Sequence, residues 1–247
     1  MRLALACLSL VLFGTAQAQV TVVNGASFRS EQPVAPGSFA TIKGSFTGVP
    51  LTFSSGYPLP KTLAGVSIQV DGIDAPIFAV SDQQINFLIP FGATIGVRPI
   101  QVKAPSGNLT GTVRVVSAAP GIFPYDTTTA NPPHGAVLNA DGSINSATNP
   151  IKRGGVISMF ATGGGALSTA VADGAAPNAV VTTKSTPQVY IGGVEAQLFG
   201  SAMSPQYAGI WQINVYIPDK PFISGTVPVT VYQDGVDSNE VTVFVQP

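Results

Sequence analysis

The sequence is poor in charge, and this scarcity excludes several classes of protein. Charged residues make up 9% of the 247 residues, against about 25% in an ordinary soluble domain. No basic cluster exists beyond Lys152-Arg153, and a nucleic-acid-binding surface needs several Lys and Arg contacts to phosphates. We therefore expect no nucleic-acid partner. Intrinsic disorder is excluded as well, because disordered chains are rich in charge and poor in Val and Ile.

Cysteine and histidine are nearly absent, which removes most routes to metal or nucleophilic chemistry. The one cysteine is Cys7 and the one histidine is His134. A zinc site needs three or four His, Cys or carboxylate ligands, and a Ser-His-Asp site needs a histidine held firmly by its neighbours. His134 lies in a Pro-rich stretch, where we expect an exposed loop residue. We expect no catalytic residue, no cofactor and no disulfide, so the fold should depend on apolar burial alone.

Long apolar runs are missing beyond the first residues. Leu3 to Phe13 is almost wholly apolar and is followed by the small-x-small site Ala16-Gln17-Ala18, the pattern of a secretory signal peptide. The run is shorter than the ~20 residues of a membrane span. Cys7 lies inside the run rather than after it, unlike the cysteine of a lipoprotein signal. We predict a signal peptide over 1–18, cleaved after Ala18, and a periplasmic or extracellular protein without a transmembrane segment.

The abundant residues are Val, Ile, Thr, Gly and Pro, and they indicate short strands separated by turns. Two nearly identical heptads, QINFLIP (84–90) and QINVYIP (212–218), reveal that one pattern occurs twice. Alternating apolar residues in each heptad predict a half-buried strand, and the final proline ends it. If the chain contains two copies of one fold, each copy needs the same buried strand. This structural reason explains why the heptad occurs twice, and no catalytic or binding role is needed.

Further segments match in the same order along the chain. They are VVNGASF (22–28) with VLNADGSIN (137–145), APGSFATIKGS (35–45) with KRGGVISMFATG (152–163), and VSIQVDGIDAPIF (66–78) with PQVYIGGVEAQLF (187–199). The offset grows from 115 residues (22 to 137) to 128 residues (84 to 212), so the second half carries insertions, the largest around Ser201–Gly209. A repeat of this length indicates a duplicated domain rather than a solenoid, whose unit is about 20–50 residues.

The fold class that follows is all-β, with two tandem immunoglobulin-like β-sandwich domains. We place the first domain at 19–118. The second domain, 119–247, begins with a Pro-rich connection that we trace over 117–135 and expect to be partly stiff. The Ala-rich stretch 164–177 and the Gly-rich stretch 161–168 are both expected to be loops, the Gly-rich one flexible.

Local patterns add detail to the two domains. Asp71-Gly72 and Asp234-Gly235 lie between strand-like runs and are predicted hairpin turns, because Gly supplies the positive φ that a tight hairpin needs. Trp211 shares the parity of the apolar residues that follow it, so we expect it in the core.

Candidate binding residues are few. Asn139, Asp141, Ser143 and Asn145 carry oxygen at alternate positions, which makes NADGSIN a candidate calcium loop, although an EF-type loop has more carboxylates and a later Gly. An ordinary hairpin turn is the alternative. Tyr216 and Tyr232 are candidate contact residues, since an exposed ring can stack on a sugar or a partner side chain. The acidic residues lie mostly in turns, and nothing in the sequence pairs two of them for glycoside hydrolysis.

Read in order, the motifs resemble a known family. VVNGASF, QINFLIPFG, APGIFPYD, HGAVLNADGSINSATNPIKRGGVISMFATGGG, YAGIWQINVYIP and VYQDGVDSNEVTVFVQ are together similar to a family of uncharacterised bacterial secreted C-terminal modules, abundant in acidobacteria of the Solibacter type. The resemblance covers 20–247 and implies tandem immunoglobulin-like domains of the IPT/TIG type. It brings no established catalytic residue. Family members often follow propellers or other repeat domains, whereas here the module follows the predicted signal peptide.

Three functions stay open at this point. The first is a secreted, non-enzymatic interaction or scaffold module with a protein or polysaccharide partner outside the cytoplasm. The second is a carbohydrate-binding module, which requires an exposed aromatic platform or a calcium loop. The third is a hydrolase, which requires two carboxylates converging in a cleft, most plausibly between the domains.

Overall fold

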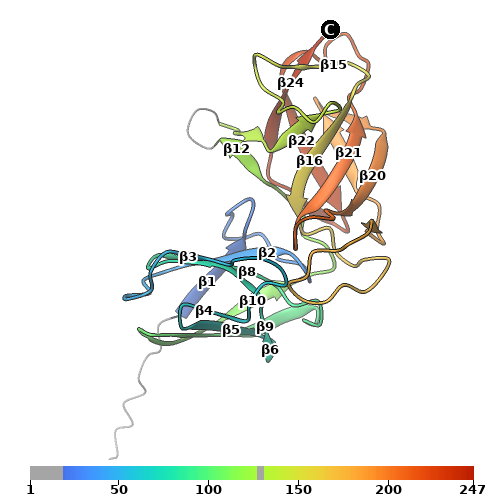
Figure 1. Cartoon of the computed structure of the whole chain (residues 1–247). Helices are drawn as coiled ribbons and strands as arrows, with labels where there is room; N and C mark the ends of the chain where they lie inside the picture. Colours follow the sequence, from blue (N-terminus) through green and yellow to red (C-terminus); the bar gives the residue numbers. More distant parts are fainter. Residues whose placement is uncertain (1–18, 127–130) are drawn as a thin grey trace, which may run out of the picture.

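The computed structural model describes residues 19–126 and 131–247, and within them the chain forms strands, turns and loops without a helix. Figure 1 shows two β-sandwiches, one from each half of the chain. The prediction of an all-β fold with two immunoglobulin-like sandwiches is confirmed. The predicted signal peptide, residues 1–18, lies outside the described residues. In the part of the chain that is described, no helix is long and apolar enough to cross a membrane.

The first sandwich has two layers that share β1. One layer runs β3-β7-β8-β2-β1 and the other β1-β10-β9-β5-β4, with β6 on β5. β1 pairs antiparallel with β2 and parallel with β10, so it joins the layers. The strands are β1 (Gln19–Asn24), β2 (Phe39–Lys43), β3 (Thr52–Phe53), β4 (Thr62–Leu63), β5 (Val66–Val70), β6 (Ile73–Asp74), β7 (Ile77–Val80), β8 (Gln84–Leu88), β9 (Gly96–Ala104) and β10 (Gly107–Val115).

The second sandwich has two separate sheets. One runs β11-β16-β21-β20-β17 with β14 on β16, and the other runs β12-β13-β24-β22-β18-β19 with β15 on β24 and β23 on β22. The strands are β11 (Gly121–Ile122), β12 (Pro124–Asp126), β13 (His134–Gly135), β14 (Val137–Asn139), β15 (Ile151–Lys152), β16 (Val156–Thr162), β17 (Val181–Thr182), β18 (Gln188–Ile191), β19 (Val194–Ala196), β20 (Leu198–Met203), β21 (Trp211–Tyr216), β22 (Gly225–Gln233), β23 (Val236–Asp237) and β24 (Val241–Gln246).

The two sandwiches repeat the same strand pairings. β8 contains the first heptad and pairs antiparallel with β2, while β21 contains the second and pairs antiparallel with β16. Thr41 lies opposite Asn86 in the first copy, and Ser158 lies opposite Asn214 in the second. The other neighbour of each heptad strand, β7 or β20, has an irregular register where it pairs. The repeat in the sequence is therefore a repeat in topology.

Period-two alternation fills one core in each sandwich. Ile85, Phe87 and Ile89 of the first heptad are fully buried in the first core. The equivalent Ile213, Val215 and Ile217 are buried in the second core, and Trp211 is buried there as well, as predicted. Burial of each such side chain contributes about 1.5–3 kcal/mol to folding, which is how this chain folds without a disulfide in its described residues.

Both predicted Asp-Gly hairpins are present. Asp71 and Gly72 have φ of 54° and 76° between β5 and β6, and Asp234 and Gly235 have φ of 49° and 86° between β22 and β23. Two consecutive positive φ values define a type I′ turn, whose twist matches that of the strands it joins.

The Gly-rich stretch after β16 is packed rather than flexible, so that expectation is wrong. Gly163, Gly164 and Gly165 are all buried. A Cβ at Gly163 would lie 1.9 Å from the carbonyl oxygen of Ala119, and one at Gly164 would lie 2.7 Å from the Trp211 ring. Glycine is needed here because the backbone runs against the chain that joins the sandwiches. The Ala-rich stretch 164–177 is a loop, as expected.

The Pro-rich stretch 117–135 contains three short strands in its described part, which belong to the second sandwich. β10 ends at Val115 and β11 begins at Gly121. β11 pairs with β16, and β12 and β13 pair with each other and, through β13, with β24. Residues 127–130 lie outside the described part. Short strands that pair with distant segments leave little trace in local composition, which is why the stretch resembled a linker.

The two sandwiches meet in a third apolar cluster at their junction. Phe39, Leu59 and Leu88 from the first sandwich pack against Met203 and Ala208 from the second. In Figure 1 the layer that contains β2, β3 and β8 faces the second sandwich. An apolar interface of this kind holds two domains in one arrangement, whereas polar junctions permit relative motion.

Candidate functional site: an aromatic groove at the domain junction

The outer face of the β2–β8 layer forms the floor of a groove beside the junction. Alternate residues of β2 enter the core, so Phe39 and Thr41 point outward. Phe78 on β7 and Asn86 on β8 line the same floor. The Phe39 ring packs edge-on against Phe78 at 5.6 Å between centroids and against Phe123 at 6.1 Å. The floor is therefore a set of interlocked rings with two polar side chains among them.

Three partly exposed aromatic residues form the rim of the groove. Phe28, Tyr57 and Tyr207 are 41%, 39% and 50% exposed. Phe28 is presented by a turn that the buried Asn24 organises, because Asn24 Oδ1 accepts hydrogen bonds from the backbone N–H groups of Ala26 (3.0 Å) and Ser27 (3.3 Å). The sequence NGAS thus fixes where the Phe28 ring lies.

The opposite wall comes from the second sandwich. Tyr207 and Ile210 lie in the loop between β20 and β21, which the Ser204 N–H closes by donating to the Ile210 carbonyl at 2.8 Å. This loop is part of the insertion that distinguishes the second half of the chain from the first. With Phe123 it completes a groove of about 210 Å³. Both sandwiches therefore contribute to one site.

Polar groups in the floor are already oriented. Thr41 Oγ1 donates to Asn86 Oδ1 at 2.8 Å, and Gln84 Nε2 donates to the same oxygen at 2.7 Å. These two bonds fix the Asn86 amide and leave its Nδ2 without an acceptor among the described residues. An oriented amide donor surrounded by rings is the kind of group that gives a largely apolar site its specificity.

The groove is electrically neutral. None of its lining residues is charged, and none is a carboxylate or histidine. A cation lies beside the rim, since Lys43 Nζ is 4.9 Å from the centre of the Phe28 ring. Burial raises the pKa of Tyr57 above its ordinary value of 10.0, an effect that the Ala208 backbone hydrogen bond partly opposes. Tyr57 is thus a neutral hydroxyl at neutral pH, and the lining groups offer no acid–base pair.

Thr162 anchors the wall to the floor. Its Oγ1 accepts a hydrogen bond from the Phe39 N–H at 2.8 Å and donates to the Gly209 carbonyl at 3.0 Å. Gly209 has a φ of 71°, and a Cβ there would lie 2.3 Å from Leu88 Cδ2. This close approach requires glycine and holds the loop with Tyr207 against the first sandwich.

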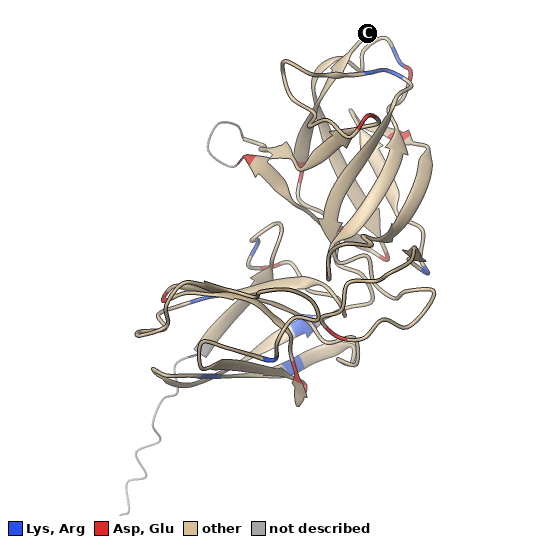
Figure 2. Cartoon of the chain, viewed as in Figure 1, with Lys and Arg blue, Asp and Glu red and all other residues tan. Residues whose placement is uncertain are grey.

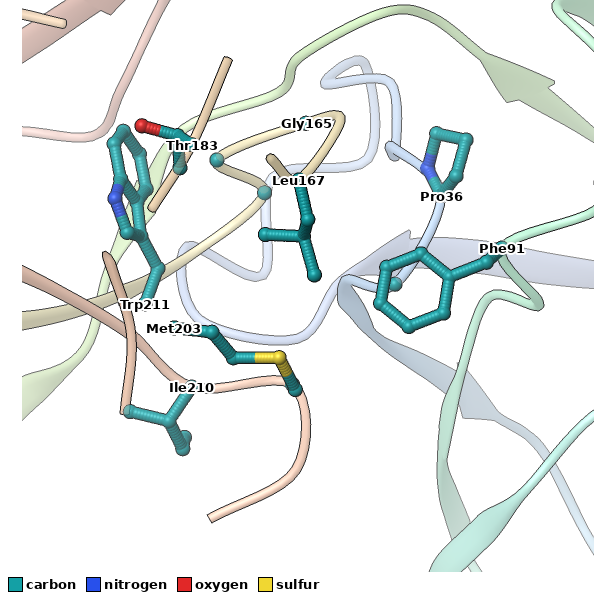
Figure 3. Close-up of a pocket in the computed structure, with 12 residues that line it drawn as sticks. Pro36, Phe91, Gly165, Leu167, Thr183, Met203, Ile210 and Trp211 are labelled. Atoms are coloured by element: carbon teal, nitrogen blue, oxygen red, sulfur yellow. The ribbon is translucent and has the colours of Figure 1, made fainter. Parts of the chain in front are cut away.

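A second hollow at the junction is too small for a ligand. Figure 3 shows it between Phe91, Leu167, Met203 and Trp211, beside the packed glycines. Its volume is about 30 Å³, which is room for one or two water molecules. It is a packing defect of the junction, and we assign it no function.

The structure separates the two predicted contact tyrosines. Tyr216 lies on β21 and Tyr232 on β22, which belong to different sheets of the second sandwich. Tyr216 is half-buried, and its ring packs edge-on against Phe199 at 5.8 Å. Tyr232 is 37% exposed. Neither lines the aromatic groove, and contact roles for them stay predictions.

The candidate calcium loop is closed by its own hydrogen bonds. Asn145 Nδ2 donates to Asn139 Oδ1 at 3.0 Å, and Asn145 Oδ1 accepts from the Phe244 N–H at 2.8 Å, so the buried Asn145 amide connects the loop to β24. Asp141 Oδ1 accepts from the N–H (2.9 Å) and hydroxyl (2.5 Å) of Ser143. These bonds lower the pKa of Asp141 below its ordinary 3.8. They are the bonds of a structured turn, and calcium binding stays a prediction.

His134 is a strand residue rather than an exposed loop residue, so that expectation is wrong. It begins β13 and is half-buried. Its Nδ1 lies 2.6 Å from Thr242 Oγ1, and its ring packs against Phe244 at 4.2 Å. The ring thus packs β13 against its neighbour β24.

Two carboxylates from different sandwiches, those of Glu31 and Asp237, line one hollow between the domains together with Arg29 and Arg114. The hydrolase therefore stays an open alternative. Asp173 lies elsewhere at the junction, and its Oδ1 accepts a hydrogen bond from the Phe91 N–H at 2.8 Å. Within the described ranges no three His, Cys, Asp or Glu side chains gather where they could hold a metal ion. Asp173 therefore fixes a loop of the second sandwich to the first.

The motifs do not reveal the groove, although two other features of the sequence point to it. Phe39 and Phe78 sit at outward positions of strands in the first half, where polar residues are expected on a solvated face. The insertion around Ser201–Gly209 supplies the residues that cover them. Outward aromatic residues in one copy, combined with an insertion in the other, indicate that the two copies touch.

Comparisons with known proteins indicate the fold of this chain and do not indicate its function. No protein-family model matches the sequence, and neither does any curated protein. One similar solved structure is SGBP-B from the mixed-linkage glucan utilization locus of Bacteroides ovatus, in complex with a mixed-linkage heptasaccharide. Its sequence is 16% identical to this chain and the TM-score is 0.33. The match covers 87% of this chain and 42% of that one.

Two further structures extend the comparison. SGBP-B from a complex xyloglucan utilization locus in Bacteroides uniformis has 15% identity, a TM-score of 0.29, and coverage of 92% of this chain and 48% of that one. The titin structure A168169 has 14% identity, a TM-score of 0.25, and coverage of 92% and 99%. This chain spans less than half the length of the two Bacteroides chains. At such identities the likeness concerns the β-sandwich fold alone.

Proposed function

We propose that this chain is a non-enzymatic binding module outside the cytoplasm, and that it holds a neutral carbohydrate in the aromatic groove at the domain junction. The observation that carries the proposal is the lining: six of its ten residues are aromatic and none is charged. A pocket lined by rings with a few oriented polar groups is the usual form of a small-ligand site.

The chemistry of the lining favours a sugar over other neutral ligands. The C–H faces of a pyranose ring are apolar and pack on aromatic rings, while its hydroxyls need donors and acceptors at the edge. Phe28, Tyr57 and Tyr207 supply partly exposed rings, and tyrosine adds a hydroxyl at the ring edge. Asn86 Nδ2 supplies an oriented donor in the floor.

The groove is already formed before a ligand binds, and this favours its affinity for a carbohydrate. Thr162 and Gly209 hold the two walls in place, so the ligand does not have to order them on binding. Binding to such a site avoids the free-energy cost of ordering loops, which otherwise reduces affinity. Secretion rests on the predicted signal peptide, and membership of the secreted module family rests on the series of motifs; both are part of this proposal.

The test is a pull-down of the purified chain on a panel of insoluble and soluble neutral polysaccharides. We expect saturable binding to at least one glycan and a loss of at least tenfold in affinity for Tyr207→Ala. Tyr125→Ala is the matched control, because Tyr125 is 62% exposed on β12 and does not line the groove. The control should bind as the unmodified chain does.

Three results would overturn this function. The chain could bind no glycan in the panel, the two tyrosine variants could behave alike, or a proline-rich peptide could occupy the groove in place of a sugar. Aromatic-lined grooves also recognise proline-rich peptides, so a labelled polyproline peptide belongs in the same assay.

A further inference from the structure

A row of side chains extends the floor of the aromatic groove across the first sandwich. Phe53 on β3 lies opposite Ala79 on β7. Ala79 lies opposite Asn86 on β8, and Asn86 lies opposite Thr41 on β2. Asn86 and Thr41 line the groove, whereas Phe53 lies outside its lining. Figure 1 shows β3, β8 and β2 in the same layer. Because residues opposite each other on neighbouring strands share a face of the sheet, the floor continues to the edge strand β3.

An irregularity in β7 brings a further ring to this row. Ile77 and Val80 lie in the first core, whereas Phe78 between them packs in the cluster at the junction. The register shifts between Ile77 and Ala79, which is the mark of a β-bulge. A bulge puts two residues of one strand opposite one residue of its neighbour and re-aims a side chain. Phe78 and the small Ala79 therefore both lie on the outer face, where the Phe78 ring can reach Phe53.

Phe53 adds an exposed ring to the rings of the floor. Its centroid lies 6.1 Å from that of Phe78, and the Phe78 centroid lies 5.6 Å from that of Phe39. Both pairs meet edge-on, which is a preferred arrangement of aromatic rings. Phe53 is 59% exposed, so part of its ring is free to contact a ligand while its edge contact with Phe78 orients it.

Exposed rings stand at both ends of the row. The layer has the strand order β3-β7-β8-β2-β1, with Phe53 on the first of these strands and Phe28 in the turn after the last. Phe28 is 41% exposed, and the oriented Asn86 amide lies between the two rings. A site for the end of a polymer is closed at one side, whereas this row is open at both ends. Its form suits the interior of a chain.

The row carries almost no charge. The strands β3, β7 and β8 contain no charged residue, and β2 contains Lys43 alone. Figure 2 shows little blue or red on this layer. A polyanion would require several Lys or Arg contacts, so the row favours a neutral polymer.

We propose that the ligand of the aromatic groove is the interior of an extended neutral glycan chain, which crosses the strands from Phe28 to Phe53. Phe53 then forms a further subsite, for a sugar unit beyond the groove. A chain that is already held in the groove has lost its translational freedom, so an additional contact at Phe53 increases affinity at little entropic cost. The extended site depends on the proposed carbohydrate function and specifies the form of its ligand.

Calorimetric titration with oligosaccharides of two to six sugar units, cut from the polysaccharide selected by pull-down, tests the extended site. We expect the affinity of the unmodified chain to rise at least tenfold from the shortest to the longest. Phe53→Ala should lower the affinity for the longest oligosaccharide at least fivefold and leave that for the shortest within twofold. Phe53→Tyr, which keeps the ring, should preserve the dependence on length.

Phe222→Ala is the matched control, because Phe222 is 67% exposed in the second sandwich and does not line the groove. It should bind every oligosaccharide as the unmodified chain does. An affinity that does not rise with length, or normal binding of the longest oligosaccharide by Phe53→Ala, would overturn the extended site and leave the groove as a carbohydrate site. An equal loss at every length would make Phe53 a support of the floor and overturn its role as a subsite. A chain that binds no glycan at all would overturn the proposed function together with the extended site.

Discussion

At the scale of single residues, Thr162 links the floor and the wall of the groove through one buried hydroxyl. Thr162→Val keeps the shape and leaves the Phe39 N–H and the Gly209 carbonyl without their partner. A buried backbone group left unpaired costs about 1–3 kcal/mol, so we expect a loss of about 2 kcal/mol or more in the free energy of unfolding. Urea denaturation measures it.

The control for Thr162 is the exposed strand residue Thr226. Thr226→Val should change the free energy of unfolding by no more than about 0.5 kcal/mol, as exposed substitutions do. Equal effects of the two substitutions would show that the loss at Thr162 is a property of the Thr-to-Val change and not of the junction.

Asp141 offers a prediction about pH at the same scale. Its pKa is held below the ordinary 3.8 by the Ser143 hydroxyl and N–H. A group whose pKa is lower in the folded state stabilises the fold above its unfolded pKa, and this contribution is lost as the pH falls below about 4 and through the folded pKa. Ser143→Ala removes the larger of the two hydrogen-bond effects.

NMR titration of the Asp141 carboxyl measures this effect. We expect its pKa to rise toward 3.8 in Ser143→Ala, with the acid-side loss of stability beginning at a higher pH. An unchanged Asp141 pKa would mean that the Ser143 hydroxyl does not hold the carboxylate in solution.

At the scale of elements, the type I′ hairpins isolate the effect of backbone conformation. Gly235 has a φ of 86°, and no heavy atom lies within 4 Å of the Cβ that a substitution would add. Gly235→Ala therefore adds left-handed strain without a clash, and we expect a loss of about 1 to 2 kcal/mol. Gly56 is the control, since it is equally open but lacks a positive φ.

Thermal unfolding compares the two glycine variants. Gly235→Ala should lower the midpoint of unfolding, and Gly56→Ala should leave it unchanged or raise it slightly, because alanine restricts the unfolded chain. A Gly56→Ala midpoint as low as that of Gly235→Ala would remove the left-handed turn as the cause.

Strong local patterns made the regular elements predictable. The heptad strands, the Asp-Gly turns and the buried Trp211 each follow from a period or a turn rule that acts over a few residues. The strands β11, β12 and β13 could not be predicted in this way, because they are two or three residues long. They pair with strands such as β16 and β24, which lie far along the chain. The packed glycines were missed for the same reason, since their neighbours include Ala119 and Trp211.

The candidate site was harder to predict than the fold. Its lining comes from seven separate segments of the two halves, and sequence alone does not state which faces of two domains meet. Tyr216 was chosen by its parity along one strand, and Tyr232 by its place near a strand end of the same domain. The groove residues Phe39 and Phe78 point outward by the same rule, and only the docking of the other sandwich turns their face into a binding site.

At the scale of the whole molecule, the apolar junction should make the two sandwiches unfold together. We expect one calorimetric transition, coincident with the fluorescence of Trp211, the only tryptophan of the chain. Gly209→Ala should divide it into two transitions, because the added Cβ would lie 2.3 Å from Leu88 and separate the sandwiches. Gly235→Ala, whose added Cβ would meet no heavy atom within 4 Å, should shift the transition without dividing it.

Two results would contradict this coupling. The unmodified chain could unfold in two steps, which is common for chains of two domains, or Gly209→Ala could leave a single transition at the original temperature. Either would mean that the junction does not hold the sandwiches in one arrangement, and a groove shared between them would then lack a fixed shape.

The central claim is that one ligand is bound by both sandwiches at once, and an NMR titration of the labelled chain with the glycan selected by pull-down tests it most directly. The account predicts chemical-shift changes concentrated at Phe28, Tyr57 and Asn86 of the first sandwich together with Tyr207 and Ile210 of the second. Changes confined to one sandwich, or centred on Tyr232 or on Asn139–Asn145, would contradict it.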